Sequence, residues 1–243
     1  MTVAPGPVDA AVVFALAVEA DAFERLVDGR RDTRGARFTF STGRVGGASV
    51  AWCVAGVGRA AAADAARHLI AGHEPRLLIT AGFAGGLAPH LRRGTVVRPG
   101  IARALGSTAR LTLSHPGAAD SPPLTIVTVD RIAASATAKQ ELAAATGADL
   151  VDMETFAVAE AAVAAGLECA AVRVVSDEAG ESLPGEVSLL ARPLSPLRRL
   201  GAVAGVVSRR PRAMGDLWRL WERSVLDSTT LARAVVAVIG DKG

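Results

Sequence analysis

Hydrophobic and polar residues follow each other in short blocks along most of this chain. Residues 11–16 form a continuous apolar run, typical of a strand buried on both faces, and residues 19–26 have helical composition. Similar apolar runs and alanine-rich segments continue to about residue 175. They predict strands at 11–16, 38–42, 48–54, 77–80, 95–99, 124–129, 150–151 and 169–175, and helices at 19–26, 59–71, 133–146 and 154–165. This alternation predicts a three-layer α/β/α fold, with helices on both faces of a central mixed, mostly parallel sheet.

The pattern changes after this region. Residues 180–188 predict a loop, and three helical stretches follow at 194–208, 211–224 and 227–239 without any further strand signal. We therefore expect a catalytic domain over residues 1–190. Residues 191–243 are expected to form a helical, arginine-rich extension packed on the same domain.

Composition limits the class of protein. The chain has 243 residues, of which 50% are hydrophobic, enough for one α/β domain with a substantial core. Cys53 and Cys169 have no metal-ligand or disulfide spacing, so we expect both to be reduced and buried. Neither a signal peptide nor an apolar run long enough to cross a bilayer is evident, which predicts a cytoplasmic protein.

Polar groups stand at the ends of several predicted strands. They are Glu19, the glycine-rich segment 82–86, the run 152–154 (Asp-Met-Glu), and Arg173 with the Ser-Asp pair at 176–177. Open α/β sheets bind their ligands at strand ends, so these positions are expected to form one pocket. The chain therefore has the pattern of an enzyme with a composite site.

Each motif alone also has a structural explanation. Segment 82–86 is expected to be a tight turn, which either brings backbone N–H groups to a ligand or simply ends a strand. Glu19 and the acids at 152–154 could stabilise helix starts, and Asp177 could pair with Arg173. Residues 56–58 (Gly-Val-Gly) lack the third glycine of a dinucleotide fingerprint, which argues against a nicotinamide cofactor.

In combination, the motifs resemble the nucleoside phosphorylase and nucleosidase superfamily, which includes purine nucleoside phosphorylases and methylthioadenosine/S-adenosylhomocysteine nucleosidases. The resemblance extends from about residue 10 to 180, in the order and approximate spacing of the family. The matching stretches are ALAVEA at 15–20, GVGRAAA at 56–62, TAGFAGGLAP at 80–89, VDME at 151–154 and RVVSD at 173–177.

The resemblance implies roles for the residues around the leaving group. Asp177 would protonate or hydrogen-bond N7 of a purine, with Ser176 and Arg173 orienting it. Cleavage of an N-glycosidic bond passes through an oxocarbenium-like state, and leaving-group protonation is the chemistry that it needs. Glu19 matches the position that activates water in the nucleosidases.

Other positions would hold the sugar and the base by the same resemblance. Glu154 would bind the ribose hydroxyls and Met153 would pack against the sugar. Gly82, Phe83 and Ala84 would contact the substrate. The resemblance implies no metal and no organic cofactor, and it implies a homodimer.

The identity of the nucleophile has two interpretations. Related phosphorylases surround their phosphate with arginines and a hydroxyl group, because a dianion needs several donors. The first strand here leads to Glu19, a carboxylate that repels phosphate but can activate water. We therefore favour a nucleosidase that releases adenine from an adenine nucleoside. Arg44 and Arg59 remain candidate phosphate ligands for the alternative, a purine nucleoside phosphorylase.

Two departures from the methylthioadenosine enzymes bear on the substrate. Residues 128–132 lack the base-stacking aromatic of that group, and Phe83 replaces a small polar residue. A somewhat different or larger nucleoside is expected. The missing aromatic also keeps open an alternative of another class, a non-catalytic nucleoside-binding or membrane-peripheral protein.

The C-terminal region resembles the arginine-rich helical tail of hopanoid-associated phosphorylases, which are proposed to release adenine from adenosylhopane. The corresponding segments are 191–194, 209–212 and 217–221. Leucines, tryptophans and arginines there could form an amphipathic surface for peripheral membrane contact, or could pack on the domain or a second subunit. Nucleic acid is not an expected partner, because no recognition motif accompanies the arginines.

Overall fold

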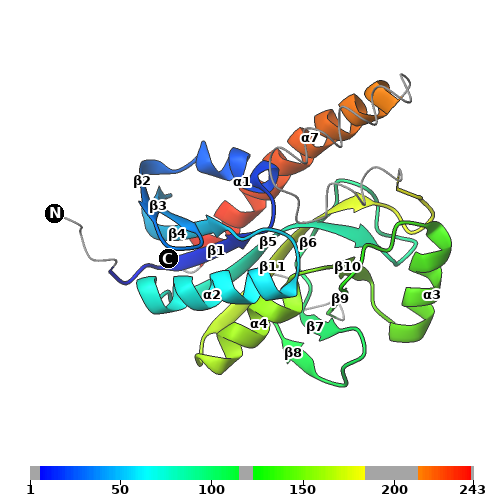
Figure 1. Cartoon of the computed structure of the whole chain (residues 1–243), viewed down its shortest axis with the longest axis horizontal. Helices are drawn as coiled ribbons and strands as arrows, with labels where there is room; N and C mark the ends of the chain where they lie inside the picture. Colours follow the sequence, from blue (N-terminus) through cyan, green and yellow to red (C-terminus); the bar gives the residue numbers. More distant parts are fainter. Residues whose placement is uncertain (1–5, 115–122, 184–212, 242–243) are drawn as a thin grey trace.

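The structure is a computed structural model that describes residues 6–114, 123–183 and 213–241, and the side chains of 226–241 in the last of these segments. Strands and helices alternate through the first two segments, and one helix forms the third (Figure 1). The helices are α1 (Ala17–Glu24), α2 (Arg59–His73), α3 (Ala136–Thr146), α4 (Thr155–Ala164) and α7 (Ala213–Gly240). The strands are β1 (Ala10–Phe14), β2 (Asp28–Arg34), β3 (Thr39–Val45), β4 (Ala48–Val54), β5 (Leu77–Gly86), β6 (Val96–Val97), β7 (Ile101–Ala104), β8 (Arg110–Thr112), β9 (Thr125–Thr128), β10 (Leu150–Asp152) and β11 (Glu168–Asp177).

The strands of the described residues belong to one mixed sheet, as expected. Its path runs β2-β3-β4-β1-β5-β10-β9-β7-β8, and β11 pairs with β5 and β6 beside this path. The central pairs β1–β4, β1–β5 and β5–β11 are parallel, while antiparallel pairs extend the sheet at β2–β3 and β7–β8. Parallel central strands bring several carboxyl ends to the same edge, which is where α/β enzymes build their sites.

The sheet is covered on both faces, and β1 shows why. Successive side chains of a strand point to opposite faces. Ala11 and Val13 join a core cluster with residues of α2 and α4, whereas Val12 and Phe14 join a second cluster with residues of α1 and α7. The apolar run therefore serves two cores, and the three-layer α/β/α fold is confirmed (Figure 1).

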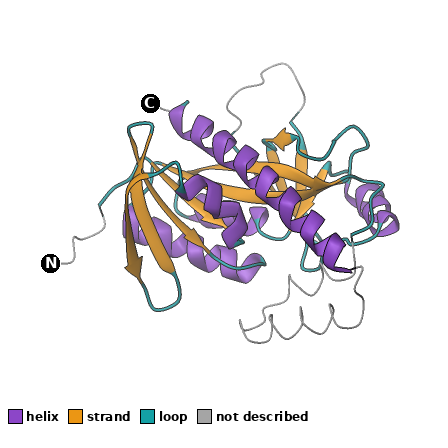
Figure 2. Cartoon of the chain, turned by 90° about the horizontal axis from the view of Figure 1, so that it is seen from above, coloured by secondary structure: helices purple, strands orange, loops and turns teal. Residues whose placement is uncertain are grey.

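The helix α7 crosses the face of the sheet that α1 also covers (Figure 2). Its last turns bury Leu231, Val235 and Val238 in the second core cluster. The sequence predicted a break between helices at 211–224 and 227–239, but a single helix spans both. The predicted helix 194–208 and the arginine segments at 191–194 and 209–212 lie outside the described residues, as do the side chains of 217–221. None of the described helices is long and apolar enough to cross a membrane.

Some local predictions were wrong. The segment 82–86 is the extended end of β5 and not a tight turn, because it pairs with β11 along most of its length and with β10 at its end. The strand β2 was not predicted, since all its residues are exposed and its sequence, DGRRDTR, has no apolar alternation. The short strands β7 and β8 were also missed.

Candidate active site

A cavity of about 350 Å³ opens where the carboxyl ends of β1, β5, β10 and β11 meet. It therefore collects strand ends that are far apart in the sequence. The predicted residues Glu19, Phe83, Ala84, Met153, Glu154, Ser176 and Asp177 line it. The other lining residues are Ala15, Leu16, Val18, Val57, Gly85, Arg93, Val129, Ile132, Ala133, Val151, Asp152, Leu183 and Asp227.

Glu19 lies in the first turn of α1, directly after β1. One carboxylate oxygen, Oε2, accepts hydrogen bonds from the backbone N–H groups of Ala15 (3.0 Å) and Leu16 (2.8 Å), and Oε1 accepts one from Phe83 (2.9 Å). The side chain thus caps the start of α1 and also reaches the cavity. Burial raises the pKa of Glu19 above its ordinary value, although the donating N–H groups act in the opposite direction.

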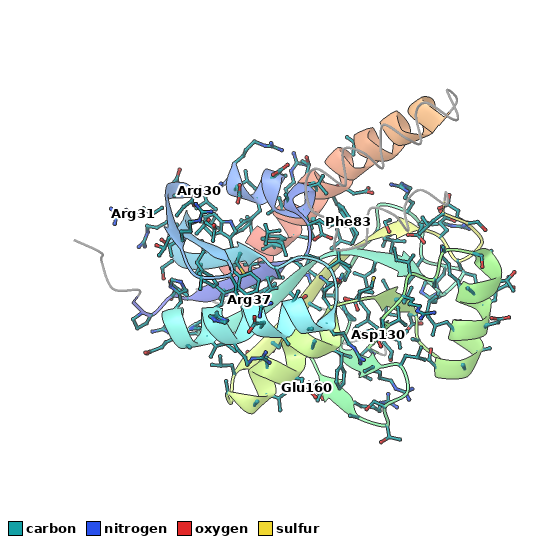
Figure 3. The ribbon with its side chains drawn as sticks, in the orientation of Figure 1. Arg30, Arg31, Arg37, Phe83, Asp130 and Glu160 are labelled. Carbon is teal, nitrogen blue, oxygen red and sulfur yellow. The ribbon has the colours of Figure 1, made fainter. Side chains whose placement is uncertain are left out.

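The strand β5 needs glycine beside Glu19. A Cβ atom on Gly82 would lie 2.6 Å from Oε1 of Glu19, closer than nonbonded atoms approach. Gly82 itself is not among the lining residues, and Phe83 lies next to it, packed partly against the core cluster under α1 and α7 (Figure 3). The glycine therefore makes room for a carboxylate, which is a different role from the predicted backbone cradle.

Glu154 faces the cavity from the turn between β10 and α4. Its Oε1 atom accepts a hydrogen bond from the N–H of Gly58 (2.8 Å), and Gly58 has the positive φ of 104° that favours glycine. Burial, followed by the negative charge of Asp152, raises the pKa of Glu154 to about 8. The glycine pair at 56 and 58 thus shapes the loop that contacts this carboxyl group.

Arg173, which the resemblance implied would help to orient the purine, does not line the cavity. Its guanidinium is buried and contacts Oδ2 of Asp152 through two nitrogens, at 2.9 and 3.2 Å. The same group donates to the hydroxyls of Thr80 and Thr155, both at 2.7 Å. Arg173 therefore fixes the position of Asp152 and of the first residue of α4, Thr155, beneath the cavity. The predicted pairing of Arg173 with Asp177 does not occur.

Asp177 ends β11 and is buried at the cavity wall. Its Oδ1 atom accepts a hydrogen bond from the hydroxyl of Ser176 (2.5 Å). Its Oδ2 atom forms an ion pair with Lys139, a buried residue of α3. Lys139 belongs to no sequence motif, because its contacts come from a segment about 40 positions away.

The cavity wall also includes residues that were not predicted from the sequence. Arg93 donates to the carbonyl oxygen of Ser176 and forms an ion pair with Asp227 of α7 (2.9 Å). Val129 and Ile132, after β9, line the wall in the region where the sequence lacks an aromatic residue. The C-terminal helix therefore contributes directly to the site.

Comparison with known proteins agrees with this architecture. The family model described as "Phosphorylase superfamily" matches residues 9–123 and 114–193, well over half of the chain. The chain belongs to the phosphorylase superfamily. The resemblance to this superfamily seen in the motifs is thereby confirmed.

Individual members of the superfamily match to different extents. The 5'-methylthioadenosine/S-adenosylhomocysteine nucleosidase of Haemophilus influenzae (strain PittEE) is 34% identical over 86 residues, which span 35% of this chain and only 38% of that protein. The corresponding nucleosidase of Colwellia psychrerythraea, solved with adenine, has a TM-score of 0.73 at 17% identity, covering 97% of this chain and 96% of its own. Futalosine hydrolase of Helicobacter pylori has a TM-score of 0.71 at 14% identity, with 99% of both chains covered. At these identities the structural likeness shows the fold.

The two arginines predicted as phosphate ligands of a phosphorylase do not line the cavity. Arg44 donates to the carbonyl oxygen of Gly47 within the β3–β4 hairpin. Arg59, at the start of α2, donates to Asp130 through two nitrogens at 2.8 and 3.0 Å. Neither side chain is placed as a phosphate ligand in this structure.

Proposed function

We propose that this member of the phosphorylase superfamily hydrolyses the N-glycosidic bond of an adenine nucleoside. The observation that carries the proposal is the convergence of Glu19, Glu154 and Asp177, from three different strand ends, on one cavity. A volume of about 350 Å³ is within the range of pockets that enclose small organic ligands. The arrangement supplies acid, base and hydrogen-bond acceptor to the same substrate.

Asp177 is the residue that we assign to the leaving group. Its carboxyl group takes up a proton from solvent and gives it to N7 of the purine, while the electron pair of the C1′–N9 bond passes to the base. Transfer of a proton to the leaving group by a positioned side chain accelerates reactions by about 10²- to 10⁴-fold. Ser176, whose hydroxyl contacts Oδ1, orients the carboxyl group.

Glu154 and Met153 are assigned to the ribose. A carboxyl group can form hydrogen bonds with neighbouring hydroxyl groups through its two oxygens, and Glu154 presents one just after β10. Met153 lies beside it in the cavity wall and offers an apolar surface to the sugar. These contacts hold the sugar as positive charge develops at C1′.

Water is the proposed nucleophile, and the charges of the site support this choice. Glu19 takes a proton from water as the water oxygen bonds to C1′, and later returns that proton to solvent. Among the described lining residues Arg93 is the cationic side chain, and it already contacts Asp227 and the Ser176 carbonyl oxygen. A phosphate dianion would have to displace these partners and to approach Glu19.

The test is release of adenine from adenosine, methylthioadenosine, S-adenosylhomocysteine and an adenosyl lipid, each with and without phosphate. The lipid is included because segments 191–221 resemble the tail of the hopanoid-associated enzymes. We expect phosphate-independent release, and Asp177→Asn should lower it by roughly 10²- to 10⁴-fold. Strict phosphate dependence would establish the phosphorylase alternative, and no release from any of the four would favour a nucleoside-binding protein.

A further inference from the structure

Lys139 is a buried cation that contacts the proposed acid. It lies in the first turn of α3 and is only 1% exposed. Its ammonium group donates to the carbonyl oxygens of Glu178 (2.7 Å) and Glu181 (2.9 Å) and forms an ion pair with Oδ2 of Asp177. Lys139 therefore has three oxygen partners, two as hydrogen-bond acceptors and one as an ion-pair partner.

The two oxygens of Asp177 are held by different groups. Lys139 contacts Oδ2 from α3, and the Ser176 hydroxyl contacts Oδ1 from the adjoining position of β11. Space around Oδ2 is tight, because a Cβ atom on Gly85 would lie 3.2 Å from it. The carboxyl group therefore has one fixed orientation at the wall of the cavity.

We infer that Lys139 is the positioning residue for Asp177 in catalysis, an inference that rests on the proposed function. When the O–H bond of the Asp177 carboxyl group breaks and the N7–H bond forms, a carboxylate remains next to the lysine. The ammonium stabilises that negative charge and keeps its own proton throughout. Because both groups are buried, the attraction is stronger than it would be in water.

The geometry favours lysine over arginine at this position. The ammonium group is compact, and one carboxylate oxygen and two carbonyl oxygens lie around its single nitrogen atom. A guanidinium is larger and planar, and its donors form a flat fork. Only Lys139 and Lys242 among the 27 basic residues are lysines, so a lysine at this buried position departs from the arginine that the chain uses elsewhere.

The alternative role of Lys139 is to hold the loop after β11. That loop also contacts the start of α3 through the N–H of Leu183, which donates to the Ala134 carbonyl oxygen (2.7 Å), and through the Ser182 hydroxyl, which accepts from the N–H of Ala136 (3.2 Å). A purely structural lysine would act on folding or on substrate affinity. A positioning lysine acts on turnover and only while the acid is present.

The experiment is a double-mutant cycle on adenine release, with Lys139→Met and Asp177→Asn measured singly and together. We expect Lys139→Met to lower kcat on the order of 10- to 100-fold while KM changes less than about 3-fold, since the acid makes its contribution in the transition state. In the Asp177→Asn background the same substitution should lower the residual kcat less than about 3-fold. Lys139→Arg should not restore the rate.

The control is Gln140→Met, which introduces the same side chain at the next, exposed position of α3. If Lys139→Met does not fold, Lys139→Gln takes its place, because an amide keeps donors for the carbonyl oxygens without the charge. Full activity of Asp177→Asn would overturn the proposed function itself. Loss of activity in Asp177→Asn with an unchanged kcat in Lys139→Met would overturn only the role of Lys139. The same conclusion would follow if Lys139→Met lowered kcat equally in the wild type and in Asp177→Asn.

Discussion

Glu154 makes the stability of this protein depend on pH in a predictable direction. The pKa of this carboxyl group is raised from 4.5 to about 8 in the folded protein, chiefly by burial and then by the charge of Asp152. Between these two values the unfolded chain has lost the Glu154 proton while the folded protein keeps it. The contribution to the free energy of unfolding is therefore complete below pH 4.5 and is lost as the pH rises through about 8.

The size of the effect follows from the same interval. At about 1.4 kcal/mol per pH unit, the difference between 4.5 and about 8 corresponds to roughly 5 kcal/mol as an upper limit. Part of the Glu154 side chain is open to solvent at the cavity, so we expect a loss of a few kcal/mol between pH 5 and pH 8. Glu154→Gln keeps the acceptor for the Gly58 N–H and removes the titration, which should flatten this part of the curve.

The assay is urea unfolding followed by far-ultraviolet circular dichroism at pH 5, 6, 7 and 8. Glu160→Gln is the matched control, since Glu160 is exposed on the same helix, α4 (Figure 3). Its curve should stay parallel to that of the wild type. Burial also raises the pKa of Glu19, so some pH dependence with the same sign should persist in Glu154→Gln. A Glu154→Gln curve parallel to the wild type would refute the reasoning.

Two further substitutions test the architecture of the site. Gly82→Ala should lower turnover by about 10²-fold or more, because its Cβ would displace the Glu19 carboxylate from its Phe83 hydrogen bond. The control is Gly72→Ala on α2, where the new Cβ has no atom within 4 Å, and it should leave adenine release unchanged. Equal activity of Gly82→Ala and Gly72→Ala would contradict the role given to Gly82. Arg173→Met should destabilise the fold by about 3–5 kcal/mol in urea unfolding, because it leaves a buried carboxylate without its cation, and a loss below about 1 kcal/mol would contradict that account.

The part of the fold that sequence could predict is the part that is buried. The run at 11–16 is apolar because alternate side chains of β1 enter two cores, and such a run identifies a central strand. The strand β2 carries no such signal. Its exposed, charged residues form a strand because they pair with β3, a long-range contact that local composition does not encode.

The site was predictable to the extent that strand ends must meet. Glu19 and Glu154 follow strands and Asp177 ends one. The parallel strands β1, β5 and β11 bring Glu19 and Asp177 to one edge of the sheet, and β10, antiparallel to the end of β5, adds Glu154. Orientation was not predictable in the same way. Nothing in the sequence around Arg173 indicates which partner its side chain contacts. In the structure it contacts Asp152 beneath the cavity, because a buried carboxylate needs a partner.

The count of basic residues does not indicate which cation contacts the proposed acid. Arginines are spread through the chain, and two of them, Arg44 and Arg59, contact partners outside the cavity. Lys139 is a single residue in an alanine-rich helix, and its contacts with Asp177, Glu178 and Glu181 form only when α3 packs beside the end of β11. A buried ammonium with three converging oxygen partners is costly unless all three are present. A buried cation in that position therefore indicates that the carboxyl group beside it needs stabilisation of its negative charge, and here that carboxyl group belongs to the proposed acid, Asp177.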